Sequence, residues 1–230
     1  MAKHKYFIAG TDTDAGKTLI ACAILEKARQ QGLTTAAIKP VAAGCERIND
    51  ELRNGDALAL QDAMTLELPY EQINPVAFEA PIAPHIAALQ QGRNLSVARL
   101  AGFCNGVLGL SCDLALVEGA GGWRVPLNPR ETLANLAVEL QVPVILVVGM
   151  KLGCISHALL TVEAIARDGL TLAGWVANRI DADMSCYEEN LMTLRSLIPA
   201  PCLGDVPFLA EATSTAAANH LDLSPLLGHV

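Results

Sequence analysis

A glycine-rich segment near the start of the chain carries residue types that bind phosphate groups. It reads Gly10-Thr-Asp-Thr-Asp-Ala-Gly-Lys-Thr18, so that a lysine and a threonine directly follow a glycine. Such a loop turns backbone N–H groups toward an anion, while the lysine supplies a positive charge and the hydroxyl a ligand for Mg²⁺. The common pattern G-x-x-x-x-G-K-[ST] would place its first glycine at Thr11. The segment is therefore predicted to be a variant phosphate-binding loop; an ordinary strand–turn–helix is the alternative.

Two carboxylates are candidates for holding Mg²⁺ beside this loop. Glu118 ends an apolar run and precedes Gly-Ala-Gly-Gly122, which would place its side chain at the C-terminal edge of a sheet, where ligands of open α/β sheets bind. Asp56 follows Arg53-Asn-Gly. Mg²⁺ prefers oxygen ligands, usually one or two carboxylates and water. Asp56 has a second interpretation as a helix N-terminal acid that the helix dipole stabilises.

Lys39 precedes Pro40 at the end of another predicted strand, at the same edge as the phosphate loop. A second cation beside a transferring phosphoryl group stabilises the charge that develops there. A solvated lysine at a strand end is the alternative interpretation. No Ser-His-Asp or Cys-His pairing stands out, so the residues alone predict Mg-nucleotide-dependent phosphoryl transfer to an unknown acceptor.

These residues need a scaffold, and short apolar runs alternate with helical patterns along the chain. That alternation is typical of a parallel sheet covered by crossover helices. We predict one α/β domain over residues 1–230, with a doubly wound parallel sheet covered by helices on both faces. The polar stretch 42–55 and the proline-containing stretch 69–84 break the alternation and are expected to be functional loops. The predicted strands are Lys5–Ala9, Thr35–Lys39, Asp113–Glu118, Val142–Val148, Leu170–Asn178 and Cys202–Val206. The predicted helices are Lys17–Gln31, Asp56–Met64, Pro84–Gln91, Val97–Leu110, Glu131–Leu140, Ile155–Arg167 and Ser185–Leu197.

The composition narrows the class of partner. Of 230 residues, 52% are hydrophobic and 17% charged, against about 25% charged in an average soluble domain, which excludes disordered and fibrous classes. A net charge of -8 argues against nucleic acid or an anionic membrane as a partner. The longest apolar run, Val142–Met150, is far shorter than the roughly 20 residues of a membrane helix. Seven cysteines without a C-x-x-C pair suit the reducing cytoplasm.

Six segments of the chain read, in order, Gly10–Thr18, Lys39-Pro-Val41, Leu52-Arg-Asn-Gly-Asp-Ala-Leu58, Val117-Glu-Gly-Ala-Gly-Gly-Trp123, Pro143-Val-Ile-Leu-Val-Val-Gly149 and Gly174-Trp-Val-Ala-Asn178. With these segments the chain resembles the dethiobiotin synthetase family within the broader P-loop NTPase group. The resemblance covers nearly the whole chain and implies an ATP- and Mg²⁺-dependent cyclo-ligase of biotin biosynthesis. In such an enzyme 7,8-diaminopelargonate reacts with CO₂ or bicarbonate to give a carbamate, which attacks ATP and forms a carbamic–phosphoric anhydride before the second amine closes the ring.

The resemblance also implies roles for individual residues. Lys17 and Lys39 would be catalytic, the first on the β- and γ-phosphates and the second on the carbamate. Thr18, Asp56 and Glu118 would hold Mg²⁺. The nucleotide would contact Thr13, Asp14, Ala15, Gly16, Lys17, Thr18, Gly119, Ala120 and Gly121, with its base near Asn178, Arg179, Pro207, Phe208 and Leu209. The substrate would contact Ala43 and, across the two-fold interface of a homodimer, Gly153, Cys154, Ile155 and Ser156.

Three positions depart from the family pattern. Ala43 stands where relatives commonly have serine, and Ser156 where they often have asparagine. A substrate-binding tyrosine of the late helix would fall on Asn190, with Tyr187 one turn earlier. These departures affect the substrate and keep open a paralogue that acts on a different diamine or acid.

A second alternative is a nucleotide-dependent switch of the partitioning type. The phosphate loops of those ATPases carry an extra lysine near their start. This chain has Thr11-Asp-Thr13 there, so the switch is the less favoured hypothesis.

Overall fold

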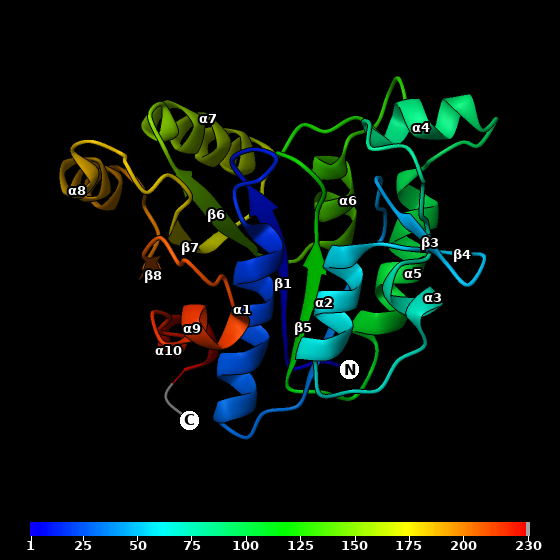
Figure 1. Ribbon diagram of the computed structural model, residues 1–230, viewed down its shortest axis with the longest axis horizontal. Helices are drawn as coiled ribbons and strands as arrows, with labels where there is room; N and C mark the ends of the chain where they lie inside the picture. Colours follow the sequence, from blue (N-terminus) through cyan, green and yellow to red (C-terminus); the bar gives the residue numbers. More distant parts are fainter. Residues whose placement is uncertain (229–230) are drawn as a thin grey trace.

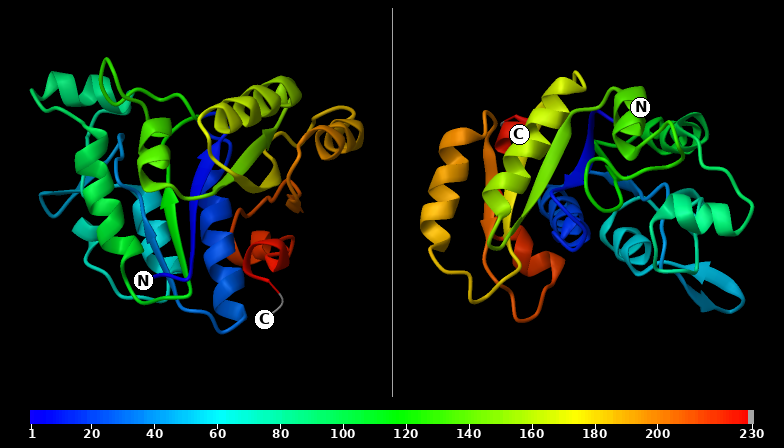
Figure 2. Two further views of the ribbon diagram at one scale, coloured as in Figure 1. Left: turned by 180° about the vertical axis from the view of Figure 1, so that it is seen from behind. Right: turned by 90° about the horizontal axis from the view of Figure 1, so that it is seen from above.

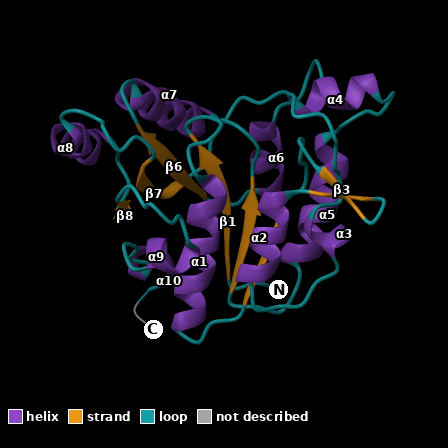
Figure 3. Ribbon diagram, viewed as in Figure 1, coloured by secondary structure: helices purple, strands orange, loops and turns teal. Residues whose placement is uncertain are grey.

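The computed structural model describes residues 1–228; the last two residues of the predicted domain lie outside the described residues. Its centre is a six-stranded sheet made of β1 (His4–Gly10), β2 (Thr35–Ile38), β5 (Leu114–Glu118), β6 (Val144–Met150), β7 (Leu172–Arg179) and β8 (Cys202–Val206). The order is β2-β5-β1-β6-β7-β8, and every neighbouring pair is parallel. Figures 1 and 3 show β5, β1 and β6 side by side at the centre of the molecule. The predicted parallel α/β sheet is therefore confirmed.

Helices cover both faces of this sheet, which Figure 2 shows from above. Alternation along β1 explains why: Phe7 and Ala9 belong to one core cluster, and Tyr6 and Ile8 to the other. Successive side chains of a strand point to opposite faces, so a fully apolar strand needs cover on both sides. The first cluster lies under α5 (Val97–Leu108), α6 (Leu133–Leu140), α7 (Cys154–Arg167) and α8 (Tyr187–Leu197), and the second under α1 (Lys17–Gln30), α2 (Gly55–Ala63), α3 (Tyr70–Ile73), α9 (Ser214–Ala218) and α10 (Ser224–Leu227).

The predicted elements are confirmed, with ends that differ by a few residues. The sixth strand along the chain begins at Val144 rather than Val142, because Pro143 has no N–H to donate to a ladder. Helix α7 begins at Cys154 rather than Ile155, and α4 spans Pro84–Gln90. The short helices α3, α9 and α10 were not predicted.

The stretch 42–55 was expected to be a loop, and part of it is a hairpin. Strands β3 (Glu46–Ile48) and β4 (Glu51–Arg53) pair antiparallel around Asn49 and Asp50. Both turn residues have positive φ, 51° and 65°, as a two-residue type I′ turn requires. The hairpin lies apart from the main sheet, so it does not alter the sheet's topology.

The strand order brings three site elements together at the C-terminal edge of the sheet. β5 lies between β1 and β2, with Glu118 opposite Ile8 and Val117 opposite Ile38. The phosphate loop follows β1, and Lys39 follows β2 directly. Glu118 therefore ends between the loop and Lys39. No helix within residues 1–228 is long and apolar enough to cross a membrane.

Candidate active site

The phosphate loop folds tightly between β1 and α1. Asp14 and Gly16 both have left-handed backbone conformations, with φ of 58° and 88°. The side chain of Lys17, the first residue of α1, turns back over the loop, and its Nζ donates to the Asp12 carbonyl at 3.0 Å. Burial lowers the pKa of Lys17. The loop thus holds a nearly buried lysine at the N-terminus of a 14-residue helix, where the helix dipole favours an anion.

Asn178, near the end of β7, contacts the backbone of this loop. Its Nδ2 donates to the Ala15 carbonyl at 3.0 Å, and the side chain is almost fully buried. A Cβ on Gly16 would lie 2.0 Å from that Nδ2. Position 16 therefore requires glycine for two reasons: its φ is positive, and the Asn178 side chain leaves no room for a Cβ.

Replacing Gly16 with alanine is expected to weaken ATP binding by at least about tenfold and to lower the free energy of unfolding by about 2–4 kcal/mol, because steric overlap adds to the cost of the left-handed backbone. Gly32→Ala is the matched control. Its φ is +77° and nothing lies within 4 Å of the added Cβ, so it should cost only about 1–2 kcal/mol. Calorimetric ATP titration and chemical denaturation measure both effects. Equal behaviour of the two variants would contradict the role of Asn178.

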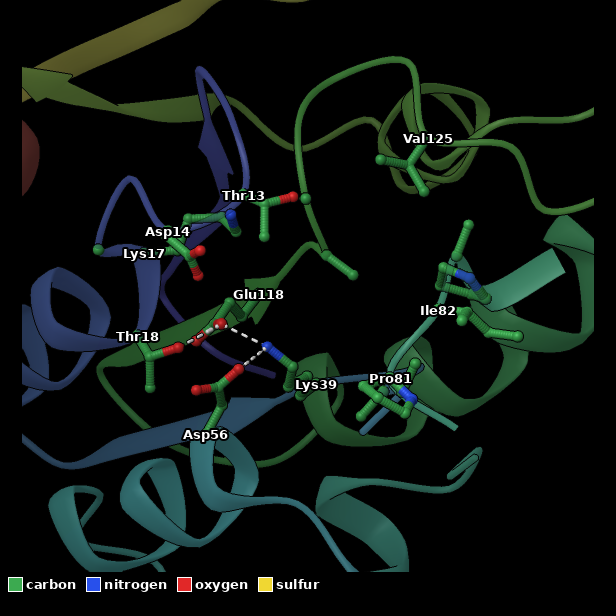
Figure 4. Close-up of a pocket in the computed structure, with 17 residues that line it drawn as sticks. Thr13, Asp14, Lys17, Thr18, Lys39, Asp56, Pro81, Ile82, Glu118 and Val125 are labelled. Atoms are coloured by element: carbon green, nitrogen blue, oxygen red, sulfur yellow. Dashed lines mark hydrogen bonds and ion pairs between the residues drawn. The ribbon is translucent and has the colours of Figure 1, made fainter. Parts of the chain in front are cut away.

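A cluster of charges lies beside the loop, in which Lys39 and Glu118 are buried and the Asp56 side chain is half exposed (Figure 4). Lys39 Nζ lies 2.6 Å from Asp56 Oδ2 and 2.7 Å from Glu118 Oε1. The same Glu118 oxygen accepts a hydrogen bond from the Thr18 hydroxyl at 2.8 Å. Burial lowers the pKa of Lys39, but the two carboxylates outweigh burial and the pKa is raised overall. Burial raises the pKa of Asp56, but the charge and hydrogen bond of Lys39, together with Thr18 and Lys17, outweigh burial and lower the pKa overall.

Two further side chains fix the segments that carry this cluster. Asn74 Nδ2 donates to the Lys39 carbonyl at 2.7 Å. The Tyr70 hydroxyl donates to Asn74 and accepts from the backbone N–H of Asn54, which caps α2 and so places Asp56 in its first turn. Sequence reasoning missed Tyr70 and Asn74. Both belong to the stretch 69–84 that was expected to be functional.

The cluster fits a hard divalent cation such as Mg²⁺. The second oxygen of Glu118, Oε2, is buried and has no hydrogen-bond partner in the described part of the chain. A buried polar atom without a partner is costly, and an ion would supply one. Thr18, Asp56 and Glu118 offer one hydroxyl and two carboxylates, the oxygen donors that Mg²⁺ takes together with water and phosphate.

The loop and the cluster open into a cavity of about 710 Å³, here called the active-site cavity. Its volume lies within the usual range of small-molecule sites. Most of the predicted residues of the phosphate and metal site line it, namely Thr13, Asp14, Gly16, Lys17, Thr18, Lys39, Asp56, Glu118, Ala120 and Gly121, together with Ala43. The opposite wall of the cavity is apolar and consists of Pro81, Ile82, Ala83, Pro84 and Val125. The sequence did not single out these five residues as part of a site.

The structure does not bring every predicted site residue to this cavity. Ala15 and Gly119 are not among the residues that line it. Asn178 lies under the loop, and Arg179 donates to the Ala182 carbonyl at 2.8 Å. Pro207 and Phe208 follow β8 as exposed side chains, with Leu209 beside them. Residues Gly153, Cys154, Ile155 and Ser156 form the start of α7, away from the cavity lining. The predicted contacts of these residues with base and substrate remain predictions.

Comparisons with known proteins decide the family. A family model described as an AAA domain matches residues 4–216. The ATP-dependent dethiobiotin synthetase BioD of Cellvibrio japonicus (strain Ueda107) is 65% identical over 227 residues, 99% of this chain and 99% of that protein. The protein of the same name from Pseudomonas aeruginosa (strain UCBPP-PA14) is 60% identical over 221 residues, 96% of this chain and 97% of its own. The chain belongs to the dethiobiotin synthetase family.

Solved structures of low identity share the fold of this dethiobiotin synthetase family member. A ParA family ATPase from Chlorobium tepidum TLS superposes with a TM-score of 0.54 at 12% identity, over 97% of this chain and 92% of that one. Signal recognition particle 54 kDa protein from Aeropyrum pernix K1, in complex with GDP, gives 0.51 at 13% identity, over 99% of this chain and 47% of that one. Both confirm the predicted P-loop NTPase-like sheet and its helices.

Within the dethiobiotin synthetase pattern, the structure shows where the departures lie. Ala43 lines the active-site cavity, so the wall carries a methyl group at the position where the family pattern has a serine hydroxyl. Tyr187 is nearly buried within its own chain: its hydroxyl donates to Asp205, and the Arg179 guanidinium lies 4.7 Å from its ring centroid. Asn190 donates to the Cys186 carbonyl. Tyr187 is thus engaged in joining α8 to β8.

Proposed function

We propose that this protein is an ATP-dependent dethiobiotin synthetase, which carboxylates 7,8-diaminopelargonate with CO₂ and closes the ureido ring. The observation that carries the proposal is the convergence of Lys17, Lys39, Thr18, Asp56 and Glu118 on one cavity of about 710 Å³. Relatives of 60% and 65% identity bear the name of this enzyme. An ATP-dependent ligase of this kind needs a phosphate cradle and a second cation for the acceptor, and the cavity offers both.

The chemistry assigns a separate task to each lysine. One amine of the substrate and CO₂ form a carbamate, whose oxygen attacks the γ-phosphorus as the bond to ADP breaks. The second amine then attacks the carbamoyl carbon, and phosphate leaves as the ring closes. Lys17 and the backbone N–H groups of the loop bind the phosphates. Lys39, held at 2.6 and 2.7 Å from two carboxylates, places its charge beside the transferred group.

The metal site belongs to the same proposal. Thr18, Asp56 and Glu118 would hold Mg²⁺, which neutralises phosphate charge when it is bound. The Thr18 hydroxyl donates to Glu118 at 2.8 Å. Thr18 also hydrogen-bonds to Asp56, which supports a shared role of the three side chains at one ion.

Asp56→Asn and Glu118→Gln are each expected to raise the Mg²⁺ concentration for half-maximal activity by at least about tenfold, because an amide replaces an anionic oxygen ligand of similar shape. Asp62→Asn, an exposed change on the same helix α2, is the control. Electron paramagnetic resonance of bound Mn²⁺ provides a readout without turnover. An unchanged titration for Asp56→Asn would return Asp56 to its role as an acid at a helix start.

We also propose a homodimer in which the start of α7 from one protomer completes the substrate site of the other. Leu152, Ser156 and Leu160 are four residues apart and exposed; the two leucines expose 89% and 62% of their surface. The two exposed leucines flank the start of this helix and support an interface there. The N-terminus of α7 would bind the carboxylate of the substrate.

Mixing two inactive variants, Lys17→Ala and Ser156→Trp, is expected to restore up to about one quarter of wild-type activity. A mixed dimer then has one site without either lesion, and random pairing makes half of the dimers mixed. Ser156 is exposed on the first turn of α7, so tryptophan there should not disturb folding. Activity of co-refolded protein and sedimentation measure the outcome. Dimers without any recovered activity would place both elements in the site of one chain.

Ring closure itself is tested by incubating the protein with ATP, Mg²⁺, bicarbonate and diaminopelargonate and detecting dethiobiotin by mass spectrometry. ADP release that ignores the diamine would favour the partitioning-type switch. Tight ATP binding without product would favour the paralogue.

We propose the cytoplasm as the compartment, since all seven cysteines are free and five are buried. We also propose that residues 1–230 form a single domain.

A further inference from the structure

A second cavity of about 490 Å³ lies between α4 and the segment 126–132. At two points of the chain, consecutive residues line the active-site cavity and this second cavity. Pro84 and Val125 line the active-site cavity, and their neighbours His85 and Pro126 line the second one. The two cavities therefore share a wall.

The polar groups of the 126–132 segment are already engaged in holding its shape. Asn128 Nδ2 donates to the Leu95 carbonyl at 2.8 Å and to Glu131 Oε2 at 2.6 Å, and that oxygen also accepts from the Val97 N–H. Leu95 and Leu127 are buried apolar parts of the wall. The only carboxylate of the second cavity, among described residues, is thus committed to the protein.

The positive charges of the second cavity, in contrast, have no acidic partner. The Arg130 side chain forms no ion pair or hydrogen bond within residues 1–228. The Arg93 guanidinium lies 4.7 Å from the Phe78 ring centroid, and its contacts with oxygen are long, 3.4 and 3.5 Å. His85 Nδ1 is buried without a hydrogen-bond partner. Two guanidinium groups without a carboxylate partner among the described residues thus line one cavity, in a chain of net charge -8.

We propose that the second cavity binds a small carboxylate that carries a short apolar chain. A guanidinium pairs with a carboxylate through two parallel hydrogen bonds, which a hydroxyl or an amine cannot match. The apolar wall would remove the chain of the ligand from water, which favours binding. The volume of about 490 Å³ suits a ligand of this size.

Calorimetric titration with sodium octanoate tests the proposal without ATP or turnover. We expect saturable binding, with 1-octanol at least about tenfold weaker because it lacks the charge. Arg130→Gln should weaken octanoate binding by about fivefold or more and leave octanol unchanged, since it removes one charge-assisted contact. Arg195→Gln, an exposed change on α8, is the matched control. Circular dichroism checks that each variant is folded.

A further variant distinguishes the two cavities. Ala43→Leu narrows the active-site cavity, whose wall it shares with Lys39, and should leave octanoate affinity unchanged. The ¹³C-labelled ring resonance of His85, assigned with His85→Gln, should move with octanoate concentration. Weaker binding to Ala43→Leu but not to Arg130→Gln would place octanoate in the active-site cavity and overturn the proposal. Equal affinity for octanol, or no saturation up to about 10 mM, would also overturn it, whichever way the ring-closure assay turns out.

Discussion

Replacing Lys17 with alanine is expected to lower turnover by about 100- to 1,000-fold while the fold survives. The Lys17 ammonium lies at the start of α1 and donates to the Asp12 carbonyl of its own loop. It forms no ion pair with any described residue. Its removal therefore leaves no buried carboxylate without a partner. The variant should lose stabilisation of the transferred phosphoryl group, while the free energy of unfolding changes little.

Lys27→Ala is the matched control for Lys17→Ala, because it removes a lysine from the last turn of the same helix. Turnover, ATP affinity and the thermal midpoint are measured for both variants. The control should keep wild-type turnover. Native circular dichroism together with near wild-type product formation by Lys17→Ala would show that the loop does not bind the reacting phosphates.

The phosphate loop was predictable because its residues are contiguous and lie between a strand and a helix. The meeting of Lys39 with Glu118 was predictable only in part. Both residues end predicted strands, so both were expected at one edge of the sheet. Their contact, however, requires β5 to lie beside β2, a strand order that no local pattern specifies.

The parts that the sequence did not reveal depend on contacts between distant segments or on short elements. Asn178 reaches Ala15 across 163 positions of the chain. The wall Pro81–Pro84 faces the phosphate loop only because the stretch 69–84 packs beside β2. The β3–β4 hairpin has strands of three residues each, too short to show a periodicity, although Asn49 and Asp50 carried a turn signal.

Replacing Lys39 with glutamine is expected to lower ring formation by at least about 100-fold while ATP affinity is retained. Unlike Lys17, Lys39 is almost fully buried between two carboxylates. Its loss leaves Glu118 in the interior without a cation, and removing one partner of a buried pair costs about 3–5 kcal/mol of folding free energy. Product formation, ATP titration and chemical denaturation are the measurements. A parallel loss of ATP affinity would assign Lys39 to the nucleotide.

The double variant Lys39→Gln/Glu118→Gln separates the two effects of Lys39. Two neutral amides leave no buried charge unpaired, so the double variant should be more stable than the sum of the single losses predicts, by about 1–3 kcal/mol. Ring formation should not recover even at saturating Mg²⁺, which offsets the loss of the proposed ligand Glu118, because the cation beside the transferred group is still absent. If turnover rose together with stability, the loss in Lys39→Gln would come from misfolding, and Lys39 would have no part in the chemistry.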